Sequence, residues 1–207
     1  MEFNLEEIGI EKGLQYECIY TTENSKGEKN AGPFGFKYLG DDKVSCTLFE
    51  GSQTLKNIME TKKYTVNITE DPLIFTYSTI GNLPEEYFDD ESAAIKDVPA
   101  YLTIEVESIE EADKDKFPLK NEKSLFLIEG KITDMKINNR CAHAYNRGLS
   151  SLIECLVNYS RYFIVDDEMK AFYENRLDEN QRIINKVSDK KTQEAIAYLK
   201  DNMLKNK

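Results

Sequence analysis

The sequence predicts an α+β protein, an antiparallel β-barrel followed by a helical C-terminal region. Through the first two thirds of its 207 residues, apolar and polar residues alternate in short runs that are separated by turn residues. From Ala142 onward the apolar residues recur at helical spacing instead. Strands first and helices last favour a division into a barrel, residues 1–137, and a helical region, residues 138–207.

Six segments have the alternation and the β-branched or aromatic composition of strands, and Gly, Asn or Asp residues separate most of them. Two helices are expected between them, at 52–60 and from Pro72 to Tyr77, where proline suits the first helical position. The acidic stretch 81–99 is predicted to be a loop and 110–122 a surface turn. The predicted strands are 15–22, 31–39, 43–49, 63–69, 101–108 and 124–137, the last with a bulge at Gly130.

Three helices are predicted at the C-terminal end. Asp166 is expected to cap the second, and Ser188-Asp189 to begin the third. The first is expected to pack through an apolar stripe made of Tyr145, Leu149, Leu152, Ile153, Leu156 and Val157.

Composition excludes several classes of function. The chain has 38 acidic and 27 basic residues and a net charge of −11, which disfavours binding to nucleic acid. Its four cysteines, at 18, 46, 141 and 155, form no Cys-x-x-Cys pair and accompany one histidine, so no metal site is expected. The acidic N-terminus and the lack of an apolar run of about 20 residues predict a cytoplasmic protein without a membrane partner.

The segment from Glu50 to Ile58 runs from a strand through glycine and two hydroxyl residues into a helix. The N–H groups and dipole at a helix N-terminus favour an anion, and hydroxyls add donors for phosphate oxygens. The segment therefore indicates a phosphate site. The alternative is that Ser52 or Thr54 only caps the helix, and this segment alone favours that reading.

A second segment, Asn30 to Phe36, begins a strand with small residues and a proline. Gly32 and Gly35 would let a flat ring approach the backbone, whose amides could bond to the edge of a heterocycle. The alternative, favoured by the segment alone, is a hairpin with proline on an edge strand.

Together, the two segments resemble the FMN-binding split β-barrel superfamily, which includes flavin reductases and pyridoxamine-phosphate oxidase-like proteins. Ser52-x-Thr54, Asn57-Ile58 and Tyr64-x-Val66-Asn67 resemble the Ser-x-Thr, Asn-Ile and aromatic-x-Val-Asn runs of flavin reductases. Asn30-Ala31-x-Pro33 is similar to the loop beside the flavin ring. Ala144-Tyr145-Asn146-Arg147 resembles a motif of a mostly archaeal, uncharacterised family that joins such a barrel to a helical region.

This resemblance implies a split β-barrel of the FMN-binding type, with FMN as the cofactor. Ser52 and Thr54 would hold the phosphate, with Asn57 supporting them. Asn67 would reach the ring or the ribityl chain. The isoalloxazine would be bordered by Ala31, Gly32, Pro33 and Phe34.

Two further positions carry alternatives. Asn146 and Arg147 are candidate cofactor-binding residues, since a guanidinium matches phosphate geometry. Arg147 could equally belong to the polar face of the helix, together with Glu154. His143 is a candidate acid or base because histidine is the usual side chain for proton transfer at neutral pH, although a structural role is favoured for a lone histidine at a strand–helix junction.

The sequence thus predicts an FMN-dependent oxidoreductase that acts on an unknown small molecule, and the resemblance implies a homodimer with each flavin near the subunit interface. The superfamily's segment for nicotinamide binding is absent, and so is a dinucleotide fingerprint. Two alternatives remain open: a flavin-binding or dimeric interaction protein without catalysis, and a barrel scaffold without flavin.

Overall fold

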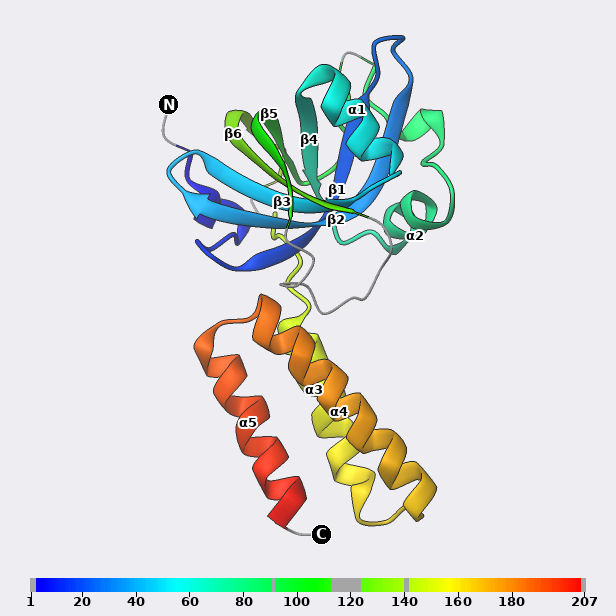
Figure 1. Ribbon diagram of the computed structural model, residues 1–207, viewed down its shortest axis with the longest axis vertical. Helices are drawn as coiled ribbons and strands as arrows, with labels where there is room; N and C mark the ends of the chain where they lie inside the picture. The colour runs from blue at the N-terminus through cyan, green and yellow to red at the C-terminus, as the bar shows by residue number, and fades with distance from the viewer. Residues whose placement is uncertain (1–2, 91, 113–123, 140–141, 206–207) are drawn as a thin grey trace. The chain divides into compact units, whose positions relative to one another are not determined.

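The protein contains a closed six-stranded antiparallel β-barrel. A computed structural model describes residues 3–90, 92–112, 124–139 and 142–205 (Figure 1). The strands follow one another around the barrel in the order β1-β2-β3-β6-β5-β4, and β1 pairs with β4 to close it. The strands are β1 (Gln15–Glu23), β2 (Lys29–Gly40), β3 (Lys43–Phe49), β4 (Lys63–Ile68), β5 (Ala100–Glu111) and β6 (Leu125–Ile137).

The alternation along the strands becomes the inside and the outside of this barrel. In β3, Val44, Cys46 and Leu48 are buried in the main core, as the sequence predicts. Residues of the same core come from every strand because each strand turns alternate side chains inward. The predicted strands and the α+β barrel class are therefore confirmed.

The bulge predicted at Gly130 is wrong. The pairing of β5 with β6 shifts between Val106 and Ser108, where the extra residue lies in β5, and again at Thr133 of β6, whereas Gly130 pairs with Val106. A Cβ atom on Gly130 would lie 2.7 Å from the carbonyl oxygen of Glu105. The glycine is there because the backbones of two strands approach closely.

Two α-helices accompany the strands of the barrel. The first, α1 (Gln53–Thr61), lies against β1 and β2, which fixes its first turn near the start of β2 (Figure 1). The second, α2 (Pro72–Ile80), is capped by Asp71 and extends beyond the predicted end at Tyr77. The predicted loop that follows includes a short 3-10 helix, Glu85–Tyr87. Another 3-10 helix, Leu5–Ile8, precedes β1.

The chain divides into two compact units, residues 1–145 and 146–207, which we call the barrel unit and the helical unit. The helical unit consists of α3 (Gly148–Tyr162), α4 (Asp167–Val187) and α5 (Lys190–Lys205). Asp166 caps α4 through the N–H of Met169, as predicted. No described helix is long and apolar enough to cross a membrane.

For the first C-terminal helix, the predicted start and the predicted buried face are both wrong. The helix begins at Gly148 rather than near Ala142, and Tyr145 instead forms a β-bridge with Glu17. Only Leu152 of the predicted stripe enters the core of the helical unit. Cys155 and Tyr162 join Leu152 in that core. The other residues of the predicted stripe are exposed: Tyr145, Leu149, Ile153, Leu156 and Val157.

Candidate functional site

The first turn of α1 is held to β1 and β2 by two hydrogen bonds. Thr22 of β1 and Asn30 of β2 are direct partners across the two strands. The Nδ2 of Asn30 donates to the Oγ1 of Thr54 at 2.9 Å, and the Nδ2 of Asn57 donates to the Oγ1 of Thr22 at 3.0 Å. Thr54 and Asn57 share one helix face because they are three residues apart. We call these four residues the α1 clamp.

Ser52 is the N-cap of α1. Its Oγ accepts the N–H of Leu55 at 3.2 Å, so the capping reading of this segment holds for Ser52. Thr54 lies inside the helix and has no capping role. The cap satisfies one N–H of the first turn and leaves those of Gln53 and Thr54, the first two of the helix, as available donors. The helix start can therefore still present donors to an anion.

The segment Ala31–Phe34 runs along β2 beside this helix start. Ala31 is buried, and its N–H donates to the Oδ1 of Asn82 at 3.3 Å. Pro33 pairs only with Ile19 of β1, since β3 pairs with β2 from Phe36 onward. The proline thus occupies a part of β2 that has a strand on one side, where its missing N–H costs no ladder bond.

Gly32 lies against the side chain of Thr54. A Cβ atom on Gly32 would stand 3.3 Å from the Oγ1 of Thr54 and 2.8 Å from the ring of Phe34. Phe34 is half-buried, and its ring meets that of Tyr20 edge to face with centroids 5.5 Å apart. The structure therefore brings Gly32, Phe34 and Thr54 together at one place, where the ring of Phe34 and the hydroxyl of Thr54 occupy the space that a side chain at position 32 would need.

Asn67 is completely buried, and its side chain is fully engaged. Its Nδ2 donates to the carbonyl oxygen of Ile19 and to the Oγ1 of Thr21, and its Oδ1 accepts the N–H of Ile95. These bonds connect β4 with β1 and with the segment before β5. The structure thus gives Asn67 the role of joining three segments of the barrel unit.

Asn146 and Arg147 open the helical unit. The Nδ2 of Asn146 donates to the carbonyl oxygen of Val187 at 2.7 Å, and its Oδ1 accepts the N–H of Gly148. Arg147 precedes α3 and contributes to lowering the pKa of Glu179, after the larger effect of Arg182. The predicted partner of Arg147 on the polar face, Glu154, forms its ion pair with Arg176 at 3.7 Å.

The buried thiols of the barrel unit are poor nucleophiles. Burial raises the pKa of the Cys46 thiol to about 12 and raises that of Cys18 further. The phenols of Tyr20 and Tyr64, stacked with centroids 5.0 Å apart, also have pKa values well above the ordinary value because they are buried. Cys141 lies outside the described residues. Among the residues that the structure describes, no three His, Cys, Asp or Glu side chains gather as metal ligands.

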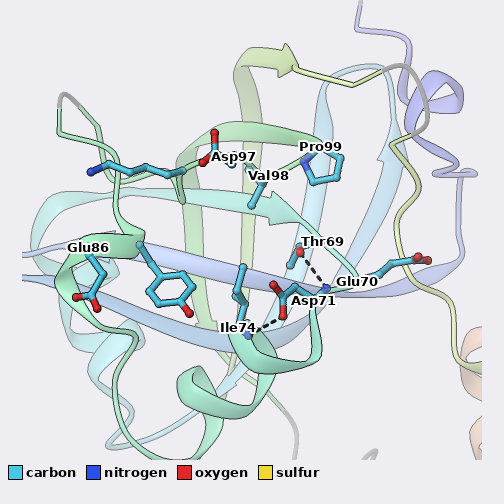
Figure 2. A pocket seen from close by; sticks show the side chains of 10 residues that line it. Thr69, Glu70, Asp71, Ile74, Glu86, Asp97, Val98 and Pro99 are labelled. Carbon is cyan, nitrogen blue, oxygen red and sulfur yellow. Dashed lines mark hydrogen bonds between the residues drawn. The ribbon is translucent and has the colours of Figure 1, made fainter.

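A cavity of about 620 Å³ lies beside the N-terminus of α2 (Figure 2). Its rim holds four carboxylates and one lysine, and that lysine, Lys96, pairs with Asp90 at 3.1 Å. This rim repels a phosphate group, which favours the start of α1 over the cavity as the anion site. The lining residues are Thr69, Glu70, Asp71, Ile74, Glu86, Tyr87, Lys96, Asp97, Val98 and Pro99.

Two residues of the α1 clamp, Thr22 and Asn30, are not among the predicted site residues. Each stands in a strand where alternation alone gives it no special role. Their importance depends on the cross-strand pairing of β1 with β2 and on the place of α1 over that pair. The sequence signal for Asn30 was its place in the run Asn30-Ala31-x-Pro33, which resembles the loop beside the flavin ring.

The barrel order, the helix after β3 and the helices at the end define an α+β split barrel with a helical C-terminal unit. Two family models match this chain. The N-terminal domain model of the protein family of unknown function DUF447 matches residues 16–138, and the model for the second part of that family matches residues 146–201. The chain belongs to the DUF447 family.

Individual proteins are similar to the chain as well. The crystal structure of an FMN-bound protein of the same family, MM1853 from Methanosarcina mazei, is 21% identical and has a TM-score of 0.55 over 96% of this chain and 99% of its own. That likeness confirms the fold. An uncharacterized protein from Methanocaldococcus jannaschii, MJ1453, is 27% identical over 149 residues, which are 70% of this chain and 73% of that protein. The styrene monooxygenase flavin reductase from Pseudomonas putida S12 is 11% identical, with a TM-score of 0.49 over 66% of this chain and 89% of its own.

Proposed function

We propose that the protein is an FMN-binding flavoprotein. The observation that carries this proposal is the juxtaposition of Gly32 with the side chain of Thr54 at the first turn of α1. Hydroxyls and N–H groups at the helix start suit a phosphate, and the absence of a side chain at position 32 lets Thr54 and Phe34 approach the backbone of the neighbouring strand.

The residues of the barrel unit divide between the two ends of the cofactor. Ser52 and Thr54 hold the phosphate, and Asn57 supports them through its bond to Thr22. The backbone and side chains of Ala31, Gly32, Pro33 and Phe34 border the isoalloxazine. Asn67 acts from inside the barrel wall, by holding the end of β4 against β1.

Family membership supports the proposal, because MM1853, described as FMN-bound, matches nearly the whole of both chains. The cofactor-binding role predicted for Asn146 and Arg147 stays a prediction. When bound, the flavin would supply oxidation–reduction chemistry, and the protein would supply its orientation and electrostatic surroundings.

A direct test is the absorbance spectrum of the purified full chain, followed by a fluorescence titration with FMN if the protein is colourless. Flavin that purifies with the protein, or quenching that saturates at one FMN per chain, is the expected result. An absence of any flavin affinity would contradict the proposal and leave the barrel as a scaffold.

Substitutions at the helix start test the phosphate assignment. Replacing Ser52 and Thr54 by alanine should weaken FMN binding by about 1.5–3 kcal/mol for each charge-assisted hydrogen bond lost. Ser52→Asp keeps an N-cap but adds a carboxylate, so it should abolish FMN binding without lowering the melting temperature. Ser52→Thr, which keeps the hydroxyl and the cap, is the matched control. Unchanged affinity in Ser52→Asp would place the phosphate elsewhere.

We further propose that the protein is an oxidoreductase that acts on a small molecule in the cytoplasm, with a flavin-binding protein without catalysis as the alternative. Turnover separates the two. An enzyme should oxidise a reduced nicotinamide or deazaflavin donor when FMN and an acceptor are present, whereas a carrier should bind FMN and consume neither.

We also propose a homodimer, and one face of α3 supports it. Leu149, Ile153, Leu156 and Phe163 are all exposed, and their spacing of four, three and seven residues is that of a coiled-coil seam. The helical unit contains 11 basic and 10 acidic residues, so two copies meet with little net repulsion, whereas the barrel unit contains 16 and 28. A second copy of α3 is therefore the partner that this face fits.

A further inference from the structure

Thr54 differs from the other helical threonines of the barrel unit in what its hydroxyl does. Thr61, Thr76 and Thr79 each donate to the carbonyl oxygen four residues earlier, at 2.9, 2.7 and 2.7 Å. Thr54 is the second residue of α1, and the residue four positions before it precedes the helix. In the part of the chain that the structure describes, the proton of the Thr54 hydroxyl has no acceptor.

Asn30 determines this arrangement. Its Nδ2 donates to the Oγ1 of Thr54 at 2.9 Å, which uses one lone pair of the hydroxyl and turns the hydroxyl proton away from the amide. Thr54 is 2% exposed, so water has little access to the unused donor. A buried donor without a partner is unfavourable, and a ligand that accepts from it removes that cost.

The hydroxyl of Ser52 is used in the same way. Its Oγ accepts the N–H of Leu55, and its proton also remains to be donated. Both hydroxyls thus accept from the protein and keep their protons for a further acceptor, beside the two N–H groups at the start of the helix. The two N–H groups and the two hydroxyl protons favour the charged oxygens of an anion, with which hydrogen bonds are stronger, over a neutral ligand hydroxyl.

We propose that Asn30 is a positioning residue that fixes the Thr54 hydroxyl as a donor and thereby makes the site select flavin with a phosphate over flavin without one. The proposal rests on the proposed flavin-binding function. It adds a residue and a direction of selectivity: FMN binds much more tightly than riboflavin, and Asn30 accounts for part of that ratio without touching the ligand.

The test compares FMN and riboflavin titrations of the full chain by flavin fluorescence. Asn30→Asp has nearly the same shape but accepts the Thr54 proton, so it should reduce the FMN-to-riboflavin affinity ratio at least about tenfold. Asn30→Leu removes the amide without adding charge and should reduce the ratio by a smaller factor, about threefold. Thermal melts of both variants show whether the barrel remains folded.

The Thr54→Val background separates orientation from direct charge repulsion. If Asn30 acts through the Thr54 hydroxyl, neither substitution at position 30 should change the ratio further once that hydroxyl is gone. A full loss on adding Asn30→Asp to Thr54→Val would overturn the proposal in favour of simple repulsion. An equal loss of FMN and riboflavin binding in the single variants would overturn it in favour of a structural role.

The failures of the two proposals are distinguishable. If the unaltered protein binds neither FMN nor riboflavin, the proposed function fails. If it binds FMN with the expected preference and Asn30→Asp leaves the affinity ratio unchanged, the flavin function stands and the role assigned to Asn30 is wrong.

Discussion

The barrel unit and the helical unit differ in the buried side-chain bonds that hold their segments together. In the barrel unit they join segments far apart in the chain, as when Asn67 bonds to Ile19 and to Ile95. In the helical unit the caps are local: Asp166 bonds to the N–H of Met169, and Asp189 to that of Thr192. The bonds of Asn67 depend on strand register, whereas the caps of Asp166 and Asp189 depend on neighbouring residues alone.

The two units also differ in the apolar side chains that they leave exposed. The barrel unit buries most of its large apolar residues but leaves Leu73, Tyr77 and Ile80 of α2 exposed, while α3 keeps a longer row of large apolar side chains exposed. A ligand site built from buried, oriented polar groups is therefore expected in the barrel unit, and an association surface in the helical unit.

The largest expected effect concerns the barrel core. Phe36 is completely buried, and Phe36→Ala should lower the free energy of unfolding by about 3–5 kcal/mol because it leaves a cavity. Phe172→Ala, at an exposed site on α4, is the control and should cost about 1 kcal/mol or less. Urea unfolding followed by circular dichroism measures both. Similar losses of unfolding free energy in the two variants would mean that Phe36 is no better packed than the exposed Phe172.

A smaller loss is expected when the long-range polar bonds of the barrel are removed. Asn67→Ala leaves the N–H of Ile95 and the hydroxyl of Thr21 without their partner, at about 1–3 kcal/mol for each unsatisfied buried group. The exposed Asn175 of α4 provides the control, and Asn175→Ala should change stability by less than about 0.5 kcal/mol. Equal urea midpoints for the two variants would contradict the expected difference between the buried, hydrogen-bonded Asn67 and the exposed Asn175.

The exposed face of α3 should matter for association rather than for folding. Ile153→Glu places a charge in the proposed seam and should raise the dissociation constant of the dimer at least about tenfold, or 1.4 kcal/mol. Tyr198→Glu, at an exposed position of α5, should leave it unchanged. Sedimentation equilibrium at several concentrations measures both. A dimer that is insensitive to Ile153→Glu would have its interface elsewhere.

The smallest effect concerns the local cap of α5. Hydrogen bonds from the N–H and hydroxyl of Thr192 lower the pKa of Asp189, so the carboxylate stabilises the fold above the ordinary aspartate pKa of about 4. That contribution is lost as the pH falls through the lower pKa of the folded state. At neutral pH, Asp189→Ala should cost about 1 kcal/mol.

Asp189→Asn is the control for the charge. Asparagine still caps the helix, so this variant should remain close to the unaltered protein at neutral pH and should lack the acid-dependent loss assigned to the carboxylate. Thermal melts between pH 3 and pH 7 measure the two variants. An equal acid-dependent loss with asparagine at this position would assign the titration to another group.

Much of the barrel could be predicted from the sequence because an inward or outward direction is a property of single residues in a strand. Val44, Cys46 and Leu48 alternate with polar residues and are all buried, as predicted. The close approach at Gly130 could not be predicted, since it depends on which backbone lies opposite. Thr54 and Asn57 were predicted site residues, but the bonds of the α1 clamp could not be predicted for the same reason, because they follow the register of Thr22 with Asn30.

The helical unit was harder to predict for a different reason. Apolar residues surround much of α3, so Leu149, Leu152 and Cys155 suggest more than one packed face. Periodicity gives the existence of such a helix but does not choose among its faces. The packing of α3 against α4 and α5 selects the face with Leu152 and Cys155.

The closure of the barrel has a consequence for its local motions. β1 and β4 are paired only from Ile19 to Thr21 and from Thr65 to Asn67, much less than the nine residue pairs between β1 and β2. The strand pair with the fewest paired residues is expected to open first. Amide hydrogens in the paired parts of β1 and β4 should therefore exchange with solvent through a partial opening that leaves the other strand pairs intact. The barrel is therefore a six-stranded sheet that is closed by one short strand pair, β1 with β4. Asn67 strengthens that closure through its bonds to Ile19 and Thr21.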